Sequence, residues 1–179
     1  MADLTFGVAI AVPEPYGSVL RERRASFGDP LADTVPSHIT LLPPAPLGTD
    51  EVDCLASRIE PIAAATAPFD VVLRGTGTFR PVSPVVFVAV SQGISETELL
   101  ADGLRESVGA AQAAFPFHPH VTVAHHLDDA GLDRAYDELA GFECAFTVTE
   151  VALYLHDSRD GWIPHRAFPL AAARTTAAG

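Results

Sequence analysis

Two stretches of this sequence follow one pattern: His38-Ile39-Thr40-Leu41 and His120-Val121-Thr122-Val123. Each reads histidine, aliphatic, threonine, aliphatic, and the two copies lie 82 positions apart in a chain of 179 residues. In an extended strand, residues i and i+2 point to the same face. Each stretch is therefore predicted to be a strand with its His and Thr on one face and two buried aliphatic residues on the other. Two such strands facing each other would bring two imidazoles and two hydroxyls into one small site.

Strands and helices are predicted on both sides of these stretches from the spacing of apolar residues. The predicted strands cover residues 5–12, 37–42, 69–79, 85–90, 120–124, 144–148, 151–155 and 161–170. The predicted helices cover residues 13–27 and 50–65, a segment opened by a capping box at 95–98, and residues 128–139. Pro43-Pro44 is expected to end the second strand, and Thr49 or Asp50 to cap the second helix. In the last helix, Leu132, Tyr136 and Leu139 are expected to face the core.

The two halves share the order strand, helix, His-x-Thr strand, helix, strand. This order predicts an α+β fold with pseudo-two-fold symmetry, in which two antiparallel sheets flank a central cleft and the helices lie outside. A change of alternation phase near Thr149-Glu150 predicts a bulge or a strand break there. We expect one bilobal domain over residues 1–171, followed by a disordered tail over 172–179.

The composition restricts the partners of the chain. The net charge is -12, with only 11 Lys and Arg residues, which argues against a broad nucleic-acid surface but allows a small anionic substrate or an RNA end in a local pocket. Cys54 and Cys144 match no metal-binding spacing and are interpreted as reduced core residues. The apolar start, residues 5–12, is too short for a signal peptide or a membrane span. We therefore expect a cytoplasmic protein, monomeric and without a membrane partner.

The two stretches and their flanks resemble the two-histidine (2H) phosphoesterase superfamily, which includes 2′-5′ RNA ligase-like proteins and cyclic phosphodiesterases. Its signature is a pair of His-x-Thr/Ser-hydrophobic motifs about eighty residues apart. The segments Pro36–Pro44 and Phe117–Ala124 look like the two motifs with their flanks. Residues 75–90 are similar to the middle hairpin of the family, and residues 148–170 to its closing strands.

This resemblance implies metal-free chemistry without a cofactor on 2′,3′-cyclic phosphates or related phosphodiesters. By position, His38 and His120 would be the catalytic acid and base, and Thr40 and Thr122 would hold the phosphate. Two imidazoles can act as base and acid near neutral pH, while hydroxyls can stabilise charge on the phosphoryl oxygens. RNA ligase-like members often carry Arg three residues after the second Thr, where this chain has His125.

Several other side chains are candidates for substrate contact. His125 and Arg80 could supply the charge that the missing Arg leaves out, and Phe79 could stack on a base. Trp162 and Tyr154 could also stack, although core packing is the simpler interpretation of all three aromatic residues. Three arginines at positions 21, 23 and 24 are expected to form a solvated helix face.

Three alternative functions remain open at this point. The first is 2′-5′ joining of RNA ends, which the acidic charge disfavours. The second is a divalent-metal hydrolase built on four histidines, although no acidic residue lies in the strand to complete the set. These histidines are His118, His120, His125 and His126. The third is a nucleotide-binding protein without turnover.

Overall fold

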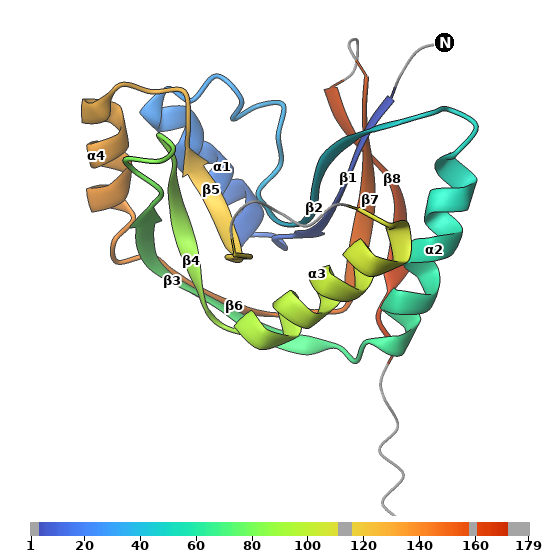
Figure 1. Cartoon of the computed structure of the whole chain (residues 1–179). Helices are drawn as coiled ribbons and strands as arrows, with labels where there is room; N and C mark the ends of the chain where they lie inside the picture. The colour runs from blue at the N-terminus through green and yellow to red at the C-terminus, as the bar shows by residue number, and fades with distance from the viewer. Residues whose placement is uncertain (1–3, 111–115, 158–160, 172–179) are drawn as a thin grey trace, which may run out of the picture.

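The computed structural model describes residues 4–110, 116–157 and 161–171. Strands and helices alternate along these ranges (Figure 1). The strands are β1 (Leu4–Ala11), β2 (His38–Leu47), β3 (Phe69–Thr78), β4 (Val86–Gln92), β5 (His120–Ala124), β6 (Glu143–Val148), β7 (Glu150–Asp157) and β8 (Gly161–Pro169). The helices are α1 (Tyr16–Phe27), α2 (Val52–Ala65), α3 (Ile94–Val108) and α4 (Asp129–Glu138). The expected tail, residues 172–179, lies outside the described residues.

The strands form two four-stranded sheets, with the orders β2-β1-β7-β8 and β5-β4-β3-β6. Every neighbouring pair in both sheets is antiparallel. The two predicted motif strands, β2 and β5, are equivalent edge strands of the two sheets, and they contact each other across the middle of the molecule. The predicted α+β, two-sheet architecture is confirmed.

Alternation along the motif strands places their side chains as the sequence predicts. Ile39 and Leu41 on β2, and Val121 and Val123 on β5, are 0–2% exposed. They belong to the apolar core that continues through both sheets and under the helices. Burying these aliphatic residues fixes the register of each strand, because a one-residue slip would turn the His and Thr inward.

Helices α1 and α3 each follow a strand of one sheet but pack beside the other sheet. Helix α1 follows β1 of the first sheet, yet it packs against β5 and α4 beside the second sheet. Helix α3 follows β4 of the second sheet, yet it packs against α2 and β2 beside the first (Figure 1). Each half of the chain therefore covers part of the other half.

Strand β2 is longer than predicted, because it continues through Pro43 and Pro44 to Leu47. The prediction that these prolines end the strand is wrong. Proline cannot donate a backbone hydrogen bond, but an edge strand has one side without a partner strand. The register with β1 also shifts between Phe6 and Val8, opposite the prolines, so a bulge accommodates them.

Both predicted helix caps also differ from the structure. Helix α2 is preceded by Glu51 rather than capped by Thr49 or Asp50, and no side-chain hydrogen bond caps it. Helix α3 begins at Ile94, before the expected capping box, because Gly93 takes a left-handed conformation with φ of 85° and turns the chain out of β4. A Cβ atom at Gly93 would lie 2.5 Å from the Asp70 carbonyl oxygen, so the turn needs glycine.

Smaller predictions have mixed outcomes. The strand break at Thr149 is confirmed, since β6 and β7 belong to different sheets. Tyr136 is 37% exposed, and Ala135 occupies the buried position on α4 instead. Cys144 is buried as expected, whereas Cys54 is exposed on α2. Among the described residues, no helix combines the length and apolarity that crossing a membrane requires.

Candidate active site

His38 is the first residue of β2, and its ring is fixed by the chain just before the strand. Its Nδ1 lies 2.7 Å from the carbonyl oxygen of Pro36. A carbonyl only accepts, so this contact assigns the proton to Nδ1 and leaves Nε2 as the second functional nitrogen.

His120 repeats this arrangement at the start of β5. Its Nδ1 lies 2.7 Å from the carbonyl oxygen of His118, again two residues earlier. The two motifs therefore share a hydrogen bond from histidine Nδ1 to the carbonyl two residues earlier, as well as a sequence pattern. In each histidine this leaves Nε2 available for proton transfer.

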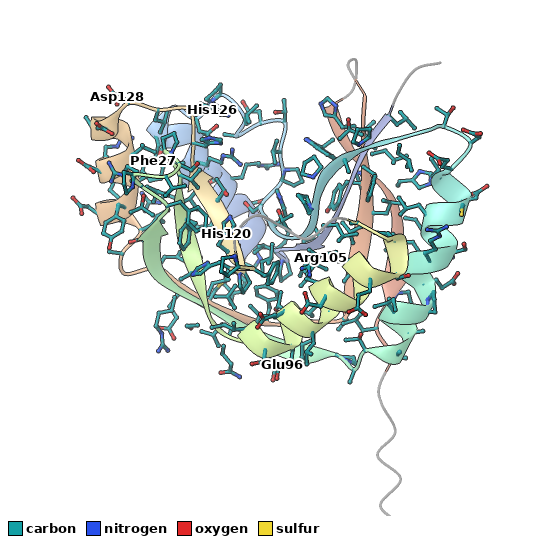
Figure 2. The ribbon with its side chains drawn as sticks, viewed as in Figure 1. Phe27, Glu96, Arg105, His120, His126 and Asp128 are labelled. Atoms are coloured by element: carbon teal, nitrogen blue, oxygen red, sulfur yellow. The ribbon has the colours of Figure 1, made fainter. Side chains whose placement is uncertain are left out.

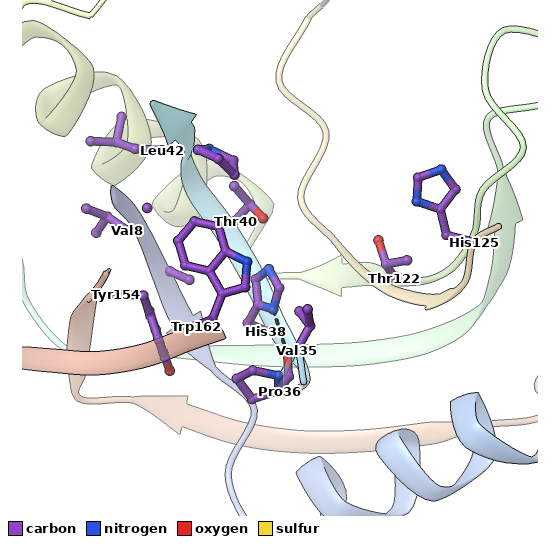
Figure 3. A pocket seen from close by; sticks show the side chains of 13 residues that line it. Val8, Val35, Pro36, His38, Thr40, Leu42, Thr122, His125, Tyr154 and Trp162 are labelled. Atoms are coloured by element: carbon purple, nitrogen blue, oxygen red, sulfur yellow. Dashed lines mark hydrogen bonds between the residues drawn. The ribbon is translucent and has the colours of Figure 1, made fainter. Parts of the chain in front are cut away.

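A cavity of about 400 Å³ lies between the two sheets. In Figure 3, His38, Thr40 and Trp162 lie on one side of it, and Thr122 and His125 lie on the other. The full lining is Gly7, Val8, Ala9, Val35, Pro36, His38, Thr40, Leu42, Pro44, Thr122, His125, Tyr154 and Trp162. Within the described residues, neither threonine hydroxyl has a protein partner, so both can donate to a bound phosphate.

A second cavity, of about 630 Å³, adjoins the first along β2. Thr40 and Leu42 line both cavities, while His120 lines only the second. Its other walls are mostly apolar: Phe6, Leu41, Pro43, Ala45, Phe79, Val82, Ser83, Arg105, Ala110, Pro116, Phe117 and His118. Thr40 thus stands at the junction of a cavity next to His38 and a cavity next to His120.

Aromatic rings surround His120. The ring centroids of Phe79 and Phe87 lie 4.9 Å and 5.1 Å from that of His120, and Phe79 meets it edge-on. The two phenylalanine rings lie 4.5 Å apart. Phe79, predicted to contact substrate, therefore lines the second cavity and also packs against the candidate catalytic ring.

Burial lowers the pKa of both motif histidines. Desolvation is the main cause at His38, and the positive charge of Arg24 lowers its pKa further, against the hydrogen bond to Pro36. Desolvation is also the main cause at His120, where His118 and His38 add to the lowering. His125 likewise has a pKa lowered by desolvation, with His126 contributing. All three rings favour their neutral form more than a free imidazole does.

The structure does not bring Arg80 into either cavity that holds a motif histidine. Its Nη2 lies 2.7 Å from Asp133 Oδ1 on α4, and its Nη1 lies 3.6 Å from Asp129 Oδ1. Two carboxylates thus neutralise it in a separate surface hollow. His125, by contrast, does line the first cavity.

The four histidines of the suspected metal cluster do not converge. His118 and His120 line the second cavity with ring centroids 6.2 Å apart, and His125 lines the first. His126 stacks on His125 at 3.8 Å and is exposed at the outer end of the molecule, near Asp128 (Figure 2). In the part of the chain that the structure describes, no three His, Cys, Asp or Glu side chains are grouped for a metal ion.

Arg24 is the charged residue that sequence reasoning placed wrongly. It was expected on a solvated helix face, but it is 6% exposed and pairs with the equally buried Asp29, Nε to Oδ2 at 2.8 Å. Asp29 Oδ2 also accepts a hydrogen bond from the backbone N–H of His125 at 2.8 Å. The only available signal was weak: an acidic residue just beyond the C-terminal end of an arginine-bearing helix.

Sequence comparison identifies relatives over most of the chain. Residues 12–160 match the model of the 2'-5' RNA ligase superfamily. A Halalkalibacterium halodurans protein named "Putative phosphoesterase BH1439" is 28% identical over 137 residues, covering 76% of this chain and 75% of its own. A Geobacillus kaustophilus protein, "Putative phosphoesterase GK0864", is 24% identical over 92% of this chain and 95% of its own.

Solved structures show the same fold. A structure described as a phosphoesterase has a TM-score of 0.70 at 23% identity and covers 94% of this chain and 99% of its own. E. coli LigT complexed with 3'-AMP has a TM-score of 0.68 at 23% identity, covering 94% of this chain and 98% of its own. Together with the family match and the paired His-x-Thr strands, these similarities show that the chain belongs to the 2'-5' RNA ligase superfamily of two-histidine phosphoesterases.

Proposed function

We propose that this protein is a metal-independent phosphodiesterase that opens 2′,3′-cyclic phosphates or related small phosphodiesters. One observation supports this above all: two equivalent edge strands carry a histidine and a threonine each, and both histidines have Nδ1 bound to a carbonyl. Paired imidazoles with free Nε2 atoms fit an in-line displacement at phosphorus.

The reaction needs one neutral and one protonated ring. The neutral imidazole takes a proton from water as the water oxygen bonds to phosphorus. The bond from phosphorus to O2′ or O3′ breaks, and the imidazolium gives its proton to the leaving alkoxide. Thr40 and Thr122 donate hydrogen bonds to the non-bridging oxygens, where negative charge grows in the transition state.

The first cavity suits a small nucleotide. At about 400 Å³ it lies within the usual size range for small-molecule sites. Trp162 and Tyr154 provide an aromatic wall on which a base could stack, and Thr40 and Thr122 provide polar groups for the phosphate.

The second cavity favours one alternative, 2′-5′ joining of RNA ends. It lies beside His120 and meets the first cavity at Thr40, so a nucleotide bringing a 5′-hydroxyl could replace water there. Its walls are mostly apolar, however, and its Arg105 is held by Asp102 at 2.5 Å. Hydrolysis of a small substrate therefore remains the first proposal.

The deciding experiment measures hydrolysis of the four nucleoside 2′,3′-cyclic monophosphates in EDTA between pH 4.5 and 9. We expect turnover in the chelator and a bell-shaped kcat/KM profile. Because burial lowers both pKa values, the singly protonated pair should be most populated below pH 6.5, the ordinary value for histidine. Activity that needs added metal, or an absence of turnover with all four nucleotides, would contradict the proposal.

A parallel assay separates hydrolysis from joining. RNA halves ending in a 2′,3′-cyclic phosphate and a 5′-hydroxyl are incubated at low and high salt. Salt-insensitive release of mononucleotide products supports the hydrolase, whereas salt-sensitive formation of a 2′-5′ junction supports the ligase.

A further inference from the structure

Phe87 is a buried aromatic residue next to both functional side chains of the second motif. It lies on β4, where it is the cross-strand partner of Thr122 on β5. Its ring centroid lies 5.1 Å from that of His120 and 5.2 Å from that of His118. Phe87 is 4% exposed and is not among the residues that line either cavity, so it can act on a substrate only through its neighbours.

A glycine on the next strand makes room for this ring. Gly77 on β3 is the cross-strand partner of Phe87 on its other side, so Thr122, Phe87 and Gly77 form one row across β5, β4 and β3 (Figure 1). A Cβ atom at position 77 would lie 2.5 Å from both Cε2 and Cζ of Phe87. Because carbon atoms in contact normally lie about 3.5–4.0 Å apart, the ring occupies space that any larger residue at position 77 would need.

Other aromatic rings enclose Phe87 on the side of the cleft. The ring centroid of Phe79 lies 4.5 Å from that of Phe87 and 4.9 Å from that of His120. Side chains in a protein interior are close-packed, so a buried ring cannot move far without moving its neighbours. A displacement of Phe87 away from Gly77 would therefore disturb the ring of Phe79 or of His120.

The first lobe has a much smaller residue at the equivalent place. Strand β1 neighbours β2 as β4 neighbours β5, and the cross-strand partner of Thr40 is Ala9. Ala9 lines the first cavity, so the space that Phe87 fills beside Thr122 is left open to a ligand beside Thr40. Strand pairing alone therefore does not require an aromatic residue at this place, and Phe87 differs from Ala9 in contacting a motif histidine.

We infer that Phe87, in the space that Gly77 provides, is a positioning residue of the second motif: its ring holds the imidazole of His120 in one orientation. The hydrogen bond from Nδ1 to the carbonyl of His118 fixes one edge of the imidazole, and the aromatic contact limits rotation of the rest. Together they keep Nε2 in one place for proton transfer. The kinetic part of the inference rests on the proposed phosphodiesterase function, whereas the orientation of the ring does not.

The central test uses two substitutions that should compensate each other. Gly77→Ala adds a methyl group that overlaps the Phe87 ring and must displace it by about 1 Å to reach an ordinary contact distance. Phe87→Leu removes Cε2 and Cζ, the two atoms that the new methyl group would meet at 2.5 Å. The double variant Gly77→Ala/Phe87→Leu should therefore be free of this overlap.

Each substitution has a matched control. Gly141→Ala adds the same methyl group at an exposed position where, apart from chain neighbours, no atom of the described residues lies within 4 Å of the new Cβ. Phe168→Leu removes the same ring atoms from a core residue that is 1% exposed and is not among the residues lining either cavity. Phe168→Leu should lower Tm, but both controls should leave kcat and the His120 ring as in the wild type.

The first readout is steady-state kinetics on a 2′,3′-cyclic nucleotide. Gly77→Ala should lower kcat by roughly tenfold to 10²-fold, the loss expected when a catalytic group is misplaced by about 1 Å. KM should change little, because neither Gly77 nor Phe87 lines a cavity. Phe87→Leu loosens the imidazole without displacing it and should lower kcat by less. The double variant should be no slower than Phe87→Leu alone, so the two effects should not add.

The second readout is the NMR spectrum of the His120 ring, which needs no turnover. The ring current of a phenylalanine shifts the signals of protons close to its face or edge, and Phe87 lies within that range of His120. Gly77→Ala and Phe87→Leu should therefore both change the chemical shifts of the His120 ring protons. Gly141→Ala and Phe168→Leu should leave these shifts unchanged.

A folded Gly77→Ala variant with wild-type kcat and wild-type His120 shifts would overturn the inference and leave Phe87 a role in core packing alone. A double variant that is slower than Phe87→Leu by the full factor of Gly77→Ala would overturn it as well. Failure of the phosphodiesterase proposal would look different: the wild type would not turn over, and the NMR readout would then decide the inference by itself. If Gly77→Ala does not fold, Phe87→Leu compared with Phe168→Leu carries both readouts.

Discussion

The two motif strands are alike in backbone and different in surroundings. On β2 and β5, the histidine begins the strand, bonds a carbonyl two residues earlier, and precedes two buried aliphatic residues. His38 lines the cavity that also holds Trp162. Around His120 lie two phenylalanine rings and a largely apolar cavity.

This difference matters because symmetric groups cannot by themselves divide the work of acid and base. The proposed phosphodiesterase reaction needs one ring neutral while the other is protonated. Desolvation favours the neutral form of both rings, with the charge of Arg24 adding to it at His38 and the rings of His118 and His38 adding to it at His120. The repeated strand therefore gives the two histidines the same backbone geometry, while different neighbours surround their rings.

Removing either imidazole should have the largest effect. We expect His38→Ala and His120→Ala each to lower kcat/KM by roughly 10²- to 10⁴-fold, since each loses a general acid or base. The double variant should be little worse than either single one, because the rings act as a unit. Steady-state kinetics on a 2′,3′-cyclic nucleotide would measure this, with the exposed His165→Ala as control. If one of the two alanine variants kept the wild-type kcat/KM, the two strands would not be functionally equivalent.

Removing the threonine hydroxyls should have the next largest effect. Thr40→Val and Thr122→Val keep the β-branched shape but cannot donate to phosphate, so kcat should fall by roughly 10²-fold in each. Thr40→Ser and Thr122→Ser should recover most of the rate. Thermal unfolding should be nearly unchanged in all four variants. A valine variant with full activity would remove that hydroxyl from the mechanism.

Changing the aromatic wall should affect binding on one side of the cleft. Trp162→Ala should raise KM for a cyclic nucleotide by about tenfold through lost stacking, with kcat largely preserved. Trp162→Phe should restore most of the affinity. An equal effect from Val82→Ala, in the second cavity, would show that the base binds next to His120 instead.

The smallest effect should be on how the stability of the native state changes with pH. Burial lowers the pKa of His38 and His120 below 6.5, so at lower pH the unfolded chain takes up protons that the native chain does not. Native stability should therefore fall as pH drops through and below 6.5. Urea midpoints at pH 8 and pH 5 should show a smaller fall in a His38→Ala/His120→Ala variant than in the wild type. An unchanged fall would mean that these rings are not desolvated.

The sequence predicted the motif strands well because their information is local. Strict alternation and two buried aliphatic residues are enough to place His120 and Thr122 on the face of β5 that points away from the core. The continuation of β2 through Pro43 could not be predicted, because it depends on the edge position of that strand. The early start of α3 depends on the left-handed turn at Gly93, which competes with the capping box.

The charged parts of the site were harder to predict. The sequence suggested that Arg80 was available to contact the substrate, but α4 supplies two carboxylates that neutralise it. Arg24 looked solvated, yet it becomes buried because α1 packs on β5, nearly a hundred residues away. Which carboxylates pair with each arginine follows from helix placement, and helix placement is a long-range property of the fold.

Helices α1 and α3 each connect to one sheet and pack beside the other, and this arrangement has a consequence for how substrate enters. Widening the cleft by moving the sheets apart would require α1 to leave β5 and α3 to leave β2 together, exposing core residues on both sides. The lobes therefore have no free hinge. In the proposed mechanism, the free energy of substrate binding would therefore not be consumed in drawing His38 and His120 together, because the fold already fixes the positions of β2 and β5.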